Sequence, residues 1–131
     1  MNSVRVTVLT TLILFTLACG YSSHTTPPVA GTMPAISELS PDSATAGGAA
    51  FMLTVNGSNF GTKAVVNWNG AAQTTTYVSG NQLTVAVPAS LIASAGSVSI
   101  SVTNPAIAGT GQYGSGATLA ETSTSVSFTI N

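Results

Sequence analysis

Charged residues are scarce in this chain. Asp, Glu, Lys and Arg make up only 4% of its 131 residues, and the formal net charge is −1. A protein that binds DNA or RNA needs many cations to neutralise phosphates, and here Arg5 and Lys63 are the only Lys or Arg residues. The composition therefore argues against nucleic-acid binding. With 44% hydrophobic residues, the solvent-facing surface is expected to consist of Ser, Thr, Asn, Gln and Gly.

The side chains that usually perform catalysis or bind metals are also few. The three acidic residues, Glu38, Asp42 and Glu121, share no motif, so a catalytic carboxylate pair is not expected. No Gly-x-Ser-x-Gly motif precedes a helix, and Cys, His or Asp ligands do not cluster as zinc or calcium sites require. His24, the only histidine, lies among Ser, Thr and Pro and is interpreted as a solvated linker residue. We predict that the chain is not an enzyme and binds neither a metal nor a cofactor.

The one long apolar run lies at the N-terminus. Residues 6–18 follow Arg5 without a charge, in a pattern typical of a secretory signal and too short for a membrane span. We therefore predict a signal peptide over residues 1–18 and export of the protein.

The only cysteine, Cys19, follows this run. The sequence Thr16-Leu17-Ala18-Cys19-Gly20 resembles a bacterial lipobox, in which the cysteine is acylated and becomes the first residue after cleavage. Ala18 and Gly20 fit that pattern, whereas Thr16 stands where an aliphatic residue is usual. The resemblance implies a lipid anchor on Cys19 in the membrane of the cell envelope.

Two other interpretations of this segment stay open. Ordinary signal cleavage after Gly20 would release a secreted protein. A buried free thiol at Cys19 is less favoured, since a lone cysteine in an exported protein has no disulfide partner.

Residues 19–34 have no periodicity and contain three prolines, so they are predicted to be an extended, mobile tether. The folded domain is predicted over residues 35–131. Its first strand, residues 35–41, is expected at a sheet edge, anchored by Ile36 and ended by Pro41, and such an edge could pair with another chain.

Alternating apolar residues and regular turn signals predict about seven short strands. The strands are expected at residues 35–41, 51–55, 64–68, 73–78, 82–87, 97–103 and 125–130. The residues expected to face the core are Phe51, Leu53, Val55, Leu83, Val85, Val87, Val98, Ile100, Val102, Val126, Phe128 and Ile130. Residues 89–93 are predicted to form one helical turn that plugs an end of the sandwich with Leu91 or Ile92.

Two turns stand out between these strands. Asn69-Gly70 predicts a type I′ hairpin that joins residues 64–68 to residues 73–78. In the segment 55–61, two glycines are expected to turn the backbone while Phe60 returns to the core. The pattern as a whole predicts an all-β sandwich.

These elements, in this order, resemble the IPT/TIG family of immunoglobulin-like domains. The resemblance covers about residues 34–131 and rests on residues 36–41, Gly57-Ser58-Asn59-Phe60-Gly61, Asn69-Gly70, residues 83–88, 96–105 and 126–130. It implies an immunoglobulin-like Greek-key sandwich without a cross-sheet disulfide, and it implies no activity. The chain departs from the family in the loop at residues 106–124, which is longer than usual.

Three aromatic residues are candidates for ligand contact. Trp68 and Tyr77 could stack on sugar rings, although a lone tryptophan in a sandwich commonly packs in the core. Tyr113 lies among glycines in the loop 106–124, where loops often carry recognition. The sequence thus predicts a non-catalytic, lipid-anchored surface module that contacts an envelope protein or a polysaccharide. The alternatives are a secreted carbohydrate-binding domain and a purely structural spacer.

Overall fold

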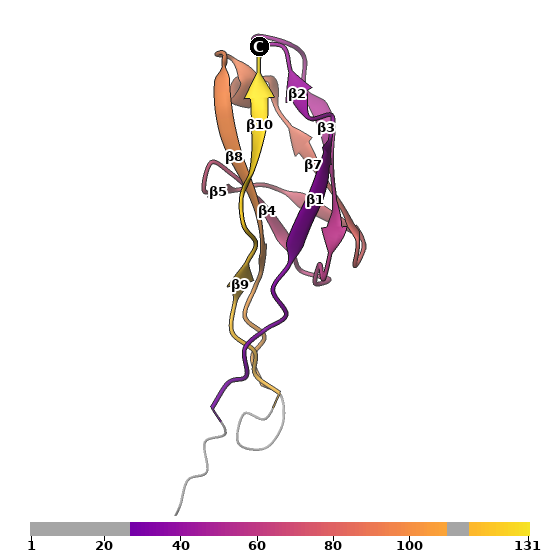
Figure 1. Cartoon of the computed structure of the whole chain (residues 1–131), viewed down its shortest axis with the longest axis vertical. Helices are drawn as coiled ribbons and strands as arrows, with labels where there is room; N and C mark the ends of the chain where they lie inside the picture. Colours follow the sequence, from indigo (N-terminus) through magenta and orange to yellow (C-terminus); the bar gives the residue numbers. More distant parts are fainter. Residues whose placement is uncertain (1–26, 110–115) are drawn as a thin grey trace, which may run out of the picture.

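The computed structural model describes residues 27–109 and 116–131, which form two packed β-sheets (Figure 1). The four-stranded sheet has the order β1 (Ala35–Ser40), β3 (Phe51–Ser58), β7 (Gln82–Val87) and β6 (Thr75–Ser79). The other sheet has the order β2 (Ser43–Ala44), β10 (Val126–Ile130), β8 (Gly96–Asn104), β4 (Val65–Trp68) and β5 (Ala71–Ala72), and β9 (Glu121–Thr122) pairs with β8. The predicted immunoglobulin-like β-sandwich is confirmed.

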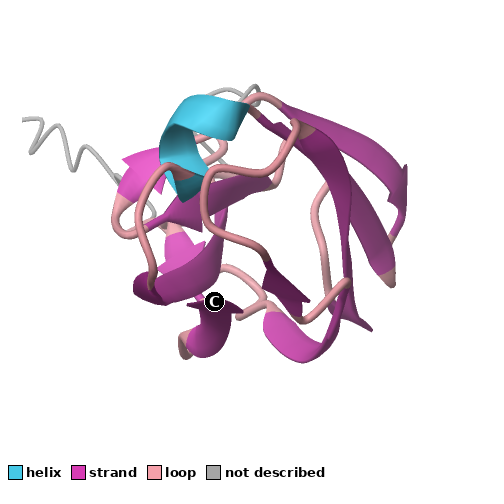
Figure 2. Ribbon diagram, turned by 90° about the horizontal axis from the view of Figure 1, so that it is seen from above, coloured by secondary structure: helices cyan, strands magenta, loops and turns pink. Residues whose placement is uncertain are grey.

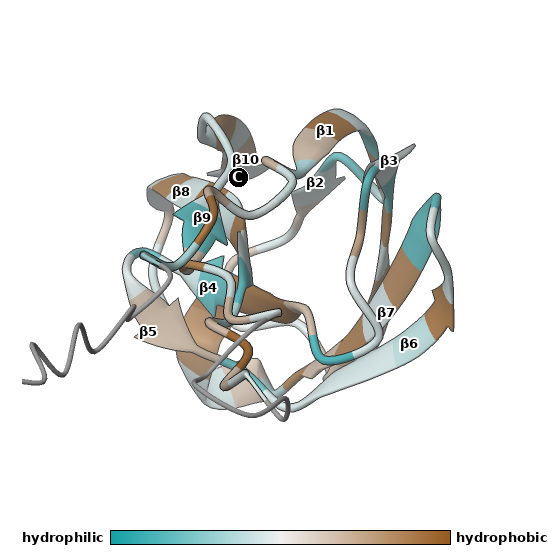
Figure 3. Cartoon of the chain, turned by 90° about the horizontal axis from the view of Figure 1, so that it is seen from below, coloured by the Kyte–Doolittle hydropathy of each residue, from teal (hydrophilic) through white to brown (hydrophobic). Residues whose placement is uncertain are grey.

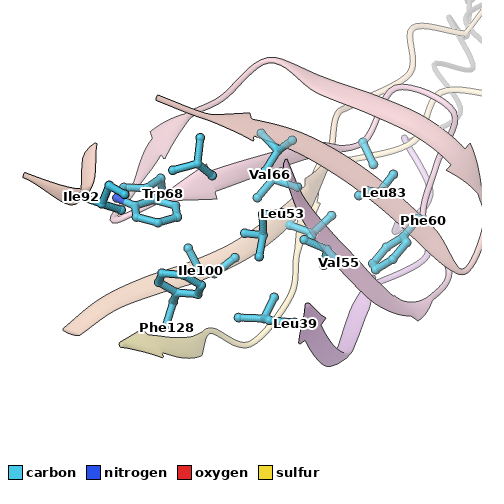
Figure 4. Close-up of a cluster of buried hydrophobic side chains, with 14 of the residues drawn as sticks. Leu39, Leu53, Val55, Phe60, Val66, Trp68, Leu83, Ile92, Ile100 and Phe128 are labelled. Atoms are coloured by element: carbon cyan, nitrogen blue, oxygen red, sulfur yellow. The ribbon is translucent and has the colours of Figure 1, made fainter. Parts of the chain in front are cut away.

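The core lies between the two sheets and follows the predicted alternation of side chains. The expected inward residues of β7, Leu83, Val85 and Val87, are fully buried. Phe128 of β10 is also fully buried, and its ring lies 5.2 Å from that of Trp68 (Figure 4). Several inward residues at strand ends are only partly buried and pack against this core, namely Phe51, Val98 and Val126. The alternating sequence pattern predicted which side chains face the core, because successive residues of a strand point to opposite faces of the sheet.

The residue of the first strand that is buried in the core differs from the prediction. A register shift between Ile36 and Glu38 interrupts the pairing of β1 with β3. Leu39 is consequently the buried residue of β1, whereas Ile36 packs at the periphery of the core. The strand lies at the edge of its sheet, as predicted, and after Pro41 the chain crosses to the second sheet, where β2 runs parallel to β10.

The hairpin at Asn69-Gly70 was predicted with the wrong partner strand. Both residues have positive φ, 49° and 84°, as a type I′ turn requires. The strand that pairs with β4 after this turn is β5, and the Gln73 amide adds one more hydrogen bond, to Val66 O at 2.9 Å. The chain then leaves the sheet, and β6 pairs with β7 in the opposite sheet. The sequence predicted a strand at residues 73–78, but it contains no local signal of which sheet that strand joins.

The segment around Phe60 buries this ring as predicted, but the turn itself has a different origin. Asn59, with φ of 60°, adopts the left-handed conformation, whereas neither Gly57 nor Gly61 has positive φ. Gly57 is required for another reason: a Cβ there would press on the carbonyl oxygen of Ala35 and lie 2.6 Å from the Phe60 ring. The glycine therefore permits close packing of β1, β3 and Phe60.

The end of the sandwich beside the C-terminus is closed by a short 3₁₀ helix, η1 (Ala89–Ile92), seen from above in Figure 2. Ile92 is buried, as predicted for this turn. Its carbonyl accepts a hydrogen bond from the Gly47 amide at 2.8 Å. No helix in the described part of the chain reaches the length and apolarity of a transmembrane segment.

The opposite end of the molecule carries a protruding stalk (Figure 1). We define the stalk as residues 27–34, 105–109 and 116–120. The Val29 amide donates to Ala117 O at 3.1 Å, the Leu119 amide donates to Val29 O at 3.0 Å, and Ile107 pairs with Thr118.

The last part of the predicted tether, residues 27–34, thus contains Val29, which takes its backbone partners from the long loop 106–124. Residues 19–26 of the predicted tether lie outside the described residues.

Candidate functional site

The side chain of Asn104 ties the stalk to the sandwich. Its amide nitrogen donates to the carbonyl oxygens of Thr32 and Asn59, each at 2.8 Å, and its oxygen accepts from the Gly61 amide at 2.8 Å. One side chain thus joins the end of β8, the turn after β3 and the first stalk segment. The sequence analysis assigned Asn104 no role, because this residue lies just beyond the strand expected at residues 97–103 and its backbone partners are distant in the sequence.

The first stalk segment also approaches the third one closely. A Cβ at Gly31 would lie 2.5 Å from Leu119 O and 3.1 Å from the Glu121 side chain. Only glycine fits this approach without a shift of the neighbouring backbone. The first and third stalk segments are therefore paired with each other rather than independent.

A cleft of about 820 Å³ lies where the stalk meets the sandwich. Its walls include Phe60, Pro105, Ile107 and Leu119, and Lys63 also lines it. Lys63 is the only Lys or Arg after residue 5 in the sequence. The cleft could accept an apolar group, because eight of its fourteen lining residues carry no polar side chain.

The stalk also exposes four large apolar side chains. The exposed fractions are 67% for Val29, 52% for Met33, 60% for Ile107 and 50% for Leu119. Met52, Tyr77 and Val78 are the only other large hydrophobic residues classed as exposed within the described part of the chain. We call Val29, Met33, Ile107 and Leu119 the stalk patch, and this end of the molecule faces the viewer in Figure 3. All four belong to the stalk, and exposed apolar side chains concentrated in one part of a molecule commonly mark an interaction site.

Trp68 and Tyr77, the two predicted contact residues that the structure describes, are not brought together. Trp68 of β4 has 4% of its surface exposed and packs on Phe128, so its ring is not presented for stacking on a sugar. Tyr77 lies on the edge strand β6 of the other sheet and has 38% of its surface exposed. Cys19 and Tyr113 lie outside the described residues.

The comparison with known families agrees with this architecture. The family model of the IPT/TIG domain matches residues 34–130. The chain belongs to the IPT/TIG family. None of the curated proteins compared with the chain matches it. TIG domains are non-catalytic immunoglobulin-like modules that often mediate contacts or act as spacers.

The match places most of the stalk inside the TIG domain. Both later stalk segments lie within the matched residues, whereas residues 27–33 precede them. The stalk is thus formed when the segment before the domain pairs with the long loop within it.

The outer face of the larger sheet of the TIG domain is lined with hydroxyl groups. The hydroxyls of Ser97 and Ser127 lie 2.6 Å apart, and those of Thr103 and Thr122 lie 2.9 Å apart. The amide of Asn67 donates to the Thr103 hydroxyl at 2.9 Å. In the described residues, no group of three or more His, Cys, Asp or Glu could hold a metal ion. The chemistry that this face offers is neutral hydrogen bonding.

Proposed function

We propose that the chain is a lipid-anchored, non-catalytic module of the bacterial cell envelope that mediates contact with a protein or a glycan. The observation that carries this proposal is the apolar run that ends in Ala18-Cys19-Gly20, shortly before a TIG domain that starts at residue 34. A signal followed at once by a cysteine supplies an acylation site, and a TIG domain supplies a stable body to present.

The arrangement of the chain is compatible with display from a membrane. The described chain begins at the stalk, and the C-terminus lies at the far end of the sandwich (Figure 1). An anchor at Cys19 would therefore hold the stalk end near the membrane and direct the end with η1 outward. Residues 106–109 and 116–120 of the loop 106–124 belong to the stalk, so this arrangement would hold them on the membrane side.

The anchor is tested by replacing the acylated residue. We expect Cys19→Ala to move the protein from the membrane fraction to the soluble fraction, because the acyl chains supply most of the membrane affinity. Ser22→Ala, three residues further on, serves as the matched control and should stay with the membrane. Equal distribution of the wild type and Cys19→Ala between the fractions would contradict the anchor.

A second experiment, independent of the anchor test, searches for the protein or glycan partner. Crosslinking in the intact envelope should recover a specific protein if the contact is with a protein. Repeated failure, together with no retention on any polysaccharide, would favour a structural spacer.

A secreted carbohydrate-binding domain is the second candidate, because Tyr77 presents part of an aromatic ring at a sheet edge. Stacking of a sugar on one aromatic ring predicts retention on an insoluble polysaccharide that falls several-fold in Tyr77→Ala or Tyr113→Ala. The melting temperatures of both variants should match that of the wild type. Unchanged retention of both variants, or none for the wild type, would contradict this function.

A further inference from the structure

We infer that the stalk rests on the lipid bilayer, with Val29, Met33, Ile107 and Leu119 in contact with the boundary between headgroups and acyl chains. This inference rests on the proposed lipid anchor at Cys19. It names the bilayer itself, rather than a protein, as the partner of the described stalk.

The length of the chain between the anchor and the stalk limits their separation. Eight residue steps lead from Cys19 to Pro27, and fully extended residues span at most about 3.3–3.6 Å each, or about 26–29 Å in total. Val29 is two residues further along and is already paired with the third stalk segment. An acylated Cys19 would therefore keep the stalk within reach of the bilayer surface.

The side chains of the stalk suit an interfacial position. Residues 27–34, 105–109 and 116–120 contain no Asp, Glu, Lys or Arg. No charge on these segments would have to leave water, and the four side chains of the stalk patch are each at least half exposed. Moving such side chains from water into the interface is favourable.

Several backbone amides of the stalk already have hydrogen-bond partners, which lowers the cost of moving them into a less polar environment. The amides of Val29, Ile107, Thr118 and Leu119 all donate to backbone carbonyls within the stalk, at 2.9–3.1 Å. Unpaired backbone groups would oppose entry into the interface because they lose hydrogen bonds to water. The pairing of the three segments removes part of this cost, at the four amides named.

The stalk segments contain no Lys or Arg, so the inference predicts how membrane contact depends on lipid charge and on salt. A basic surface would require anionic lipids and would lose affinity as salt is added. The contact inferred here is apolar and should be equal on zwitterionic and anionic vesicles and insensitive to salt.

The test uses the full mature lipoprotein reconstituted in phosphatidylcholine vesicles. An acylated Cys19 has no free thiol, so Ala108→Cys in the stalk and Ser94→Cys beyond η1 each provide a single labelling site for an environment-sensitive fluorophore. Both positions are exposed. Spin-labelled lipids should quench the label at position 108 about two-fold or more, since interfacial side chains lie within roughly 5–10 Å of the acyl boundary. The label at position 94 should be unaffected.

Two further variants in the Ala108→Cys background test whether the quenching depends on the stalk patch or on exposed apolar residues in general. Ile107→Ser combined with Leu119→Ser should abolish the quenching, whereas Met52→Ser, which alters an exposed apolar residue of β3, should not. The melting temperature of each variant verifies that the sandwich remains folded.

The outcomes distinguish the inference from the proposed function. An acylated, membrane-bound protein whose label at position 108 is not quenched would overturn the stalk contact and leave the anchor intact. Shielding of that label only in native envelopes would assign the stalk to a protein partner and overturn the inference. Reaction of the fluorophore with Cys19 would show a free thiol, which contradicts both the anchor and the inference.

Discussion

Replacing Phe128 with alanine is expected to lower the free energy of unfolding by about 3–5 kcal/mol, the range for large aromatic to alanine substitutions in cores. Phe128 is fully buried, and its ring lies 5.9 Å from Phe51 and 5.2 Å from Trp68. Its removal would leave a cavity between the two sheets and would end both aromatic contacts. Small domains have a total stability of only about 5–15 kcal/mol, so the variant should be close to unfolding.

Urea denaturation followed by tryptophan fluorescence measures this effect, because Trp68 is the only tryptophan. Val78→Ala is the control, since Val78 is an exposed residue of β6 and its truncation should change stability by less than about 0.5 kcal/mol. A loss of less than about 1 kcal/mol in Phe128→Ala would contradict the core described here.

Replacing Asn104 with alanine is expected to cost about 2–3 kcal/mol, although this residue lies at a strand end. The substitution removes three hydrogen bonds, each worth about 0.5–1.5 kcal/mol net, and leaves the Gly61 amide without its partner. The carbonyls of Thr32 and Asn59 lose a shared donor as well. Hydrogen exchange should become faster at Gly61 and in the first stalk segment.

Asn67→Ala provides the matched control for Asn104. The Asn67 amide donates to the hydroxyls of Thr103 and Ser101 rather than to backbone groups of other segments. Its loss should cost less than about 1 kcal/mol and should leave exchange in the stalk unchanged. Equal effects of the two substitutions would show that Asn104 has no special role in joining the stalk to the sandwich.

The sequence predicted the strands β3, β4, β7, β8 and β10 well because each of them buries one face. Leu83, Val85 and Val87 are all fully buried, and β7 has the bounds that alternation predicted. The turn at Asn69-Gly70 was equally clear, since both residues tolerate positive φ. Strong local turn signals and the alternation produced by a buried face therefore sufficed to predict most strands of the sandwich.

The remaining features depend on partners that local patterns do not encode. The strands β2, β5 and β9 have two residues each, too few for an alternating pattern. The stalk forms because residues 27–34 meet a loop almost 90 residues later in the sequence. Asn104 acts through three backbone groups from distant segments, and no residue near it signals this. The one signal available in advance was the unusual length of the loop 106–124.

Intact mass spectrometry of the mature protein from membrane and soluble fractions tests the central claim most directly. The proposed anchor predicts a membrane-bound species that begins at Cys19 and carries the mass of its acyl chains. A soluble species that begins at Tyr21 would contradict the anchor, since ordinary cleavage after Gly20 produces that N-terminus. In that case the chain would be a freely secreted TIG domain, and its partner would have to be sought outside the membrane.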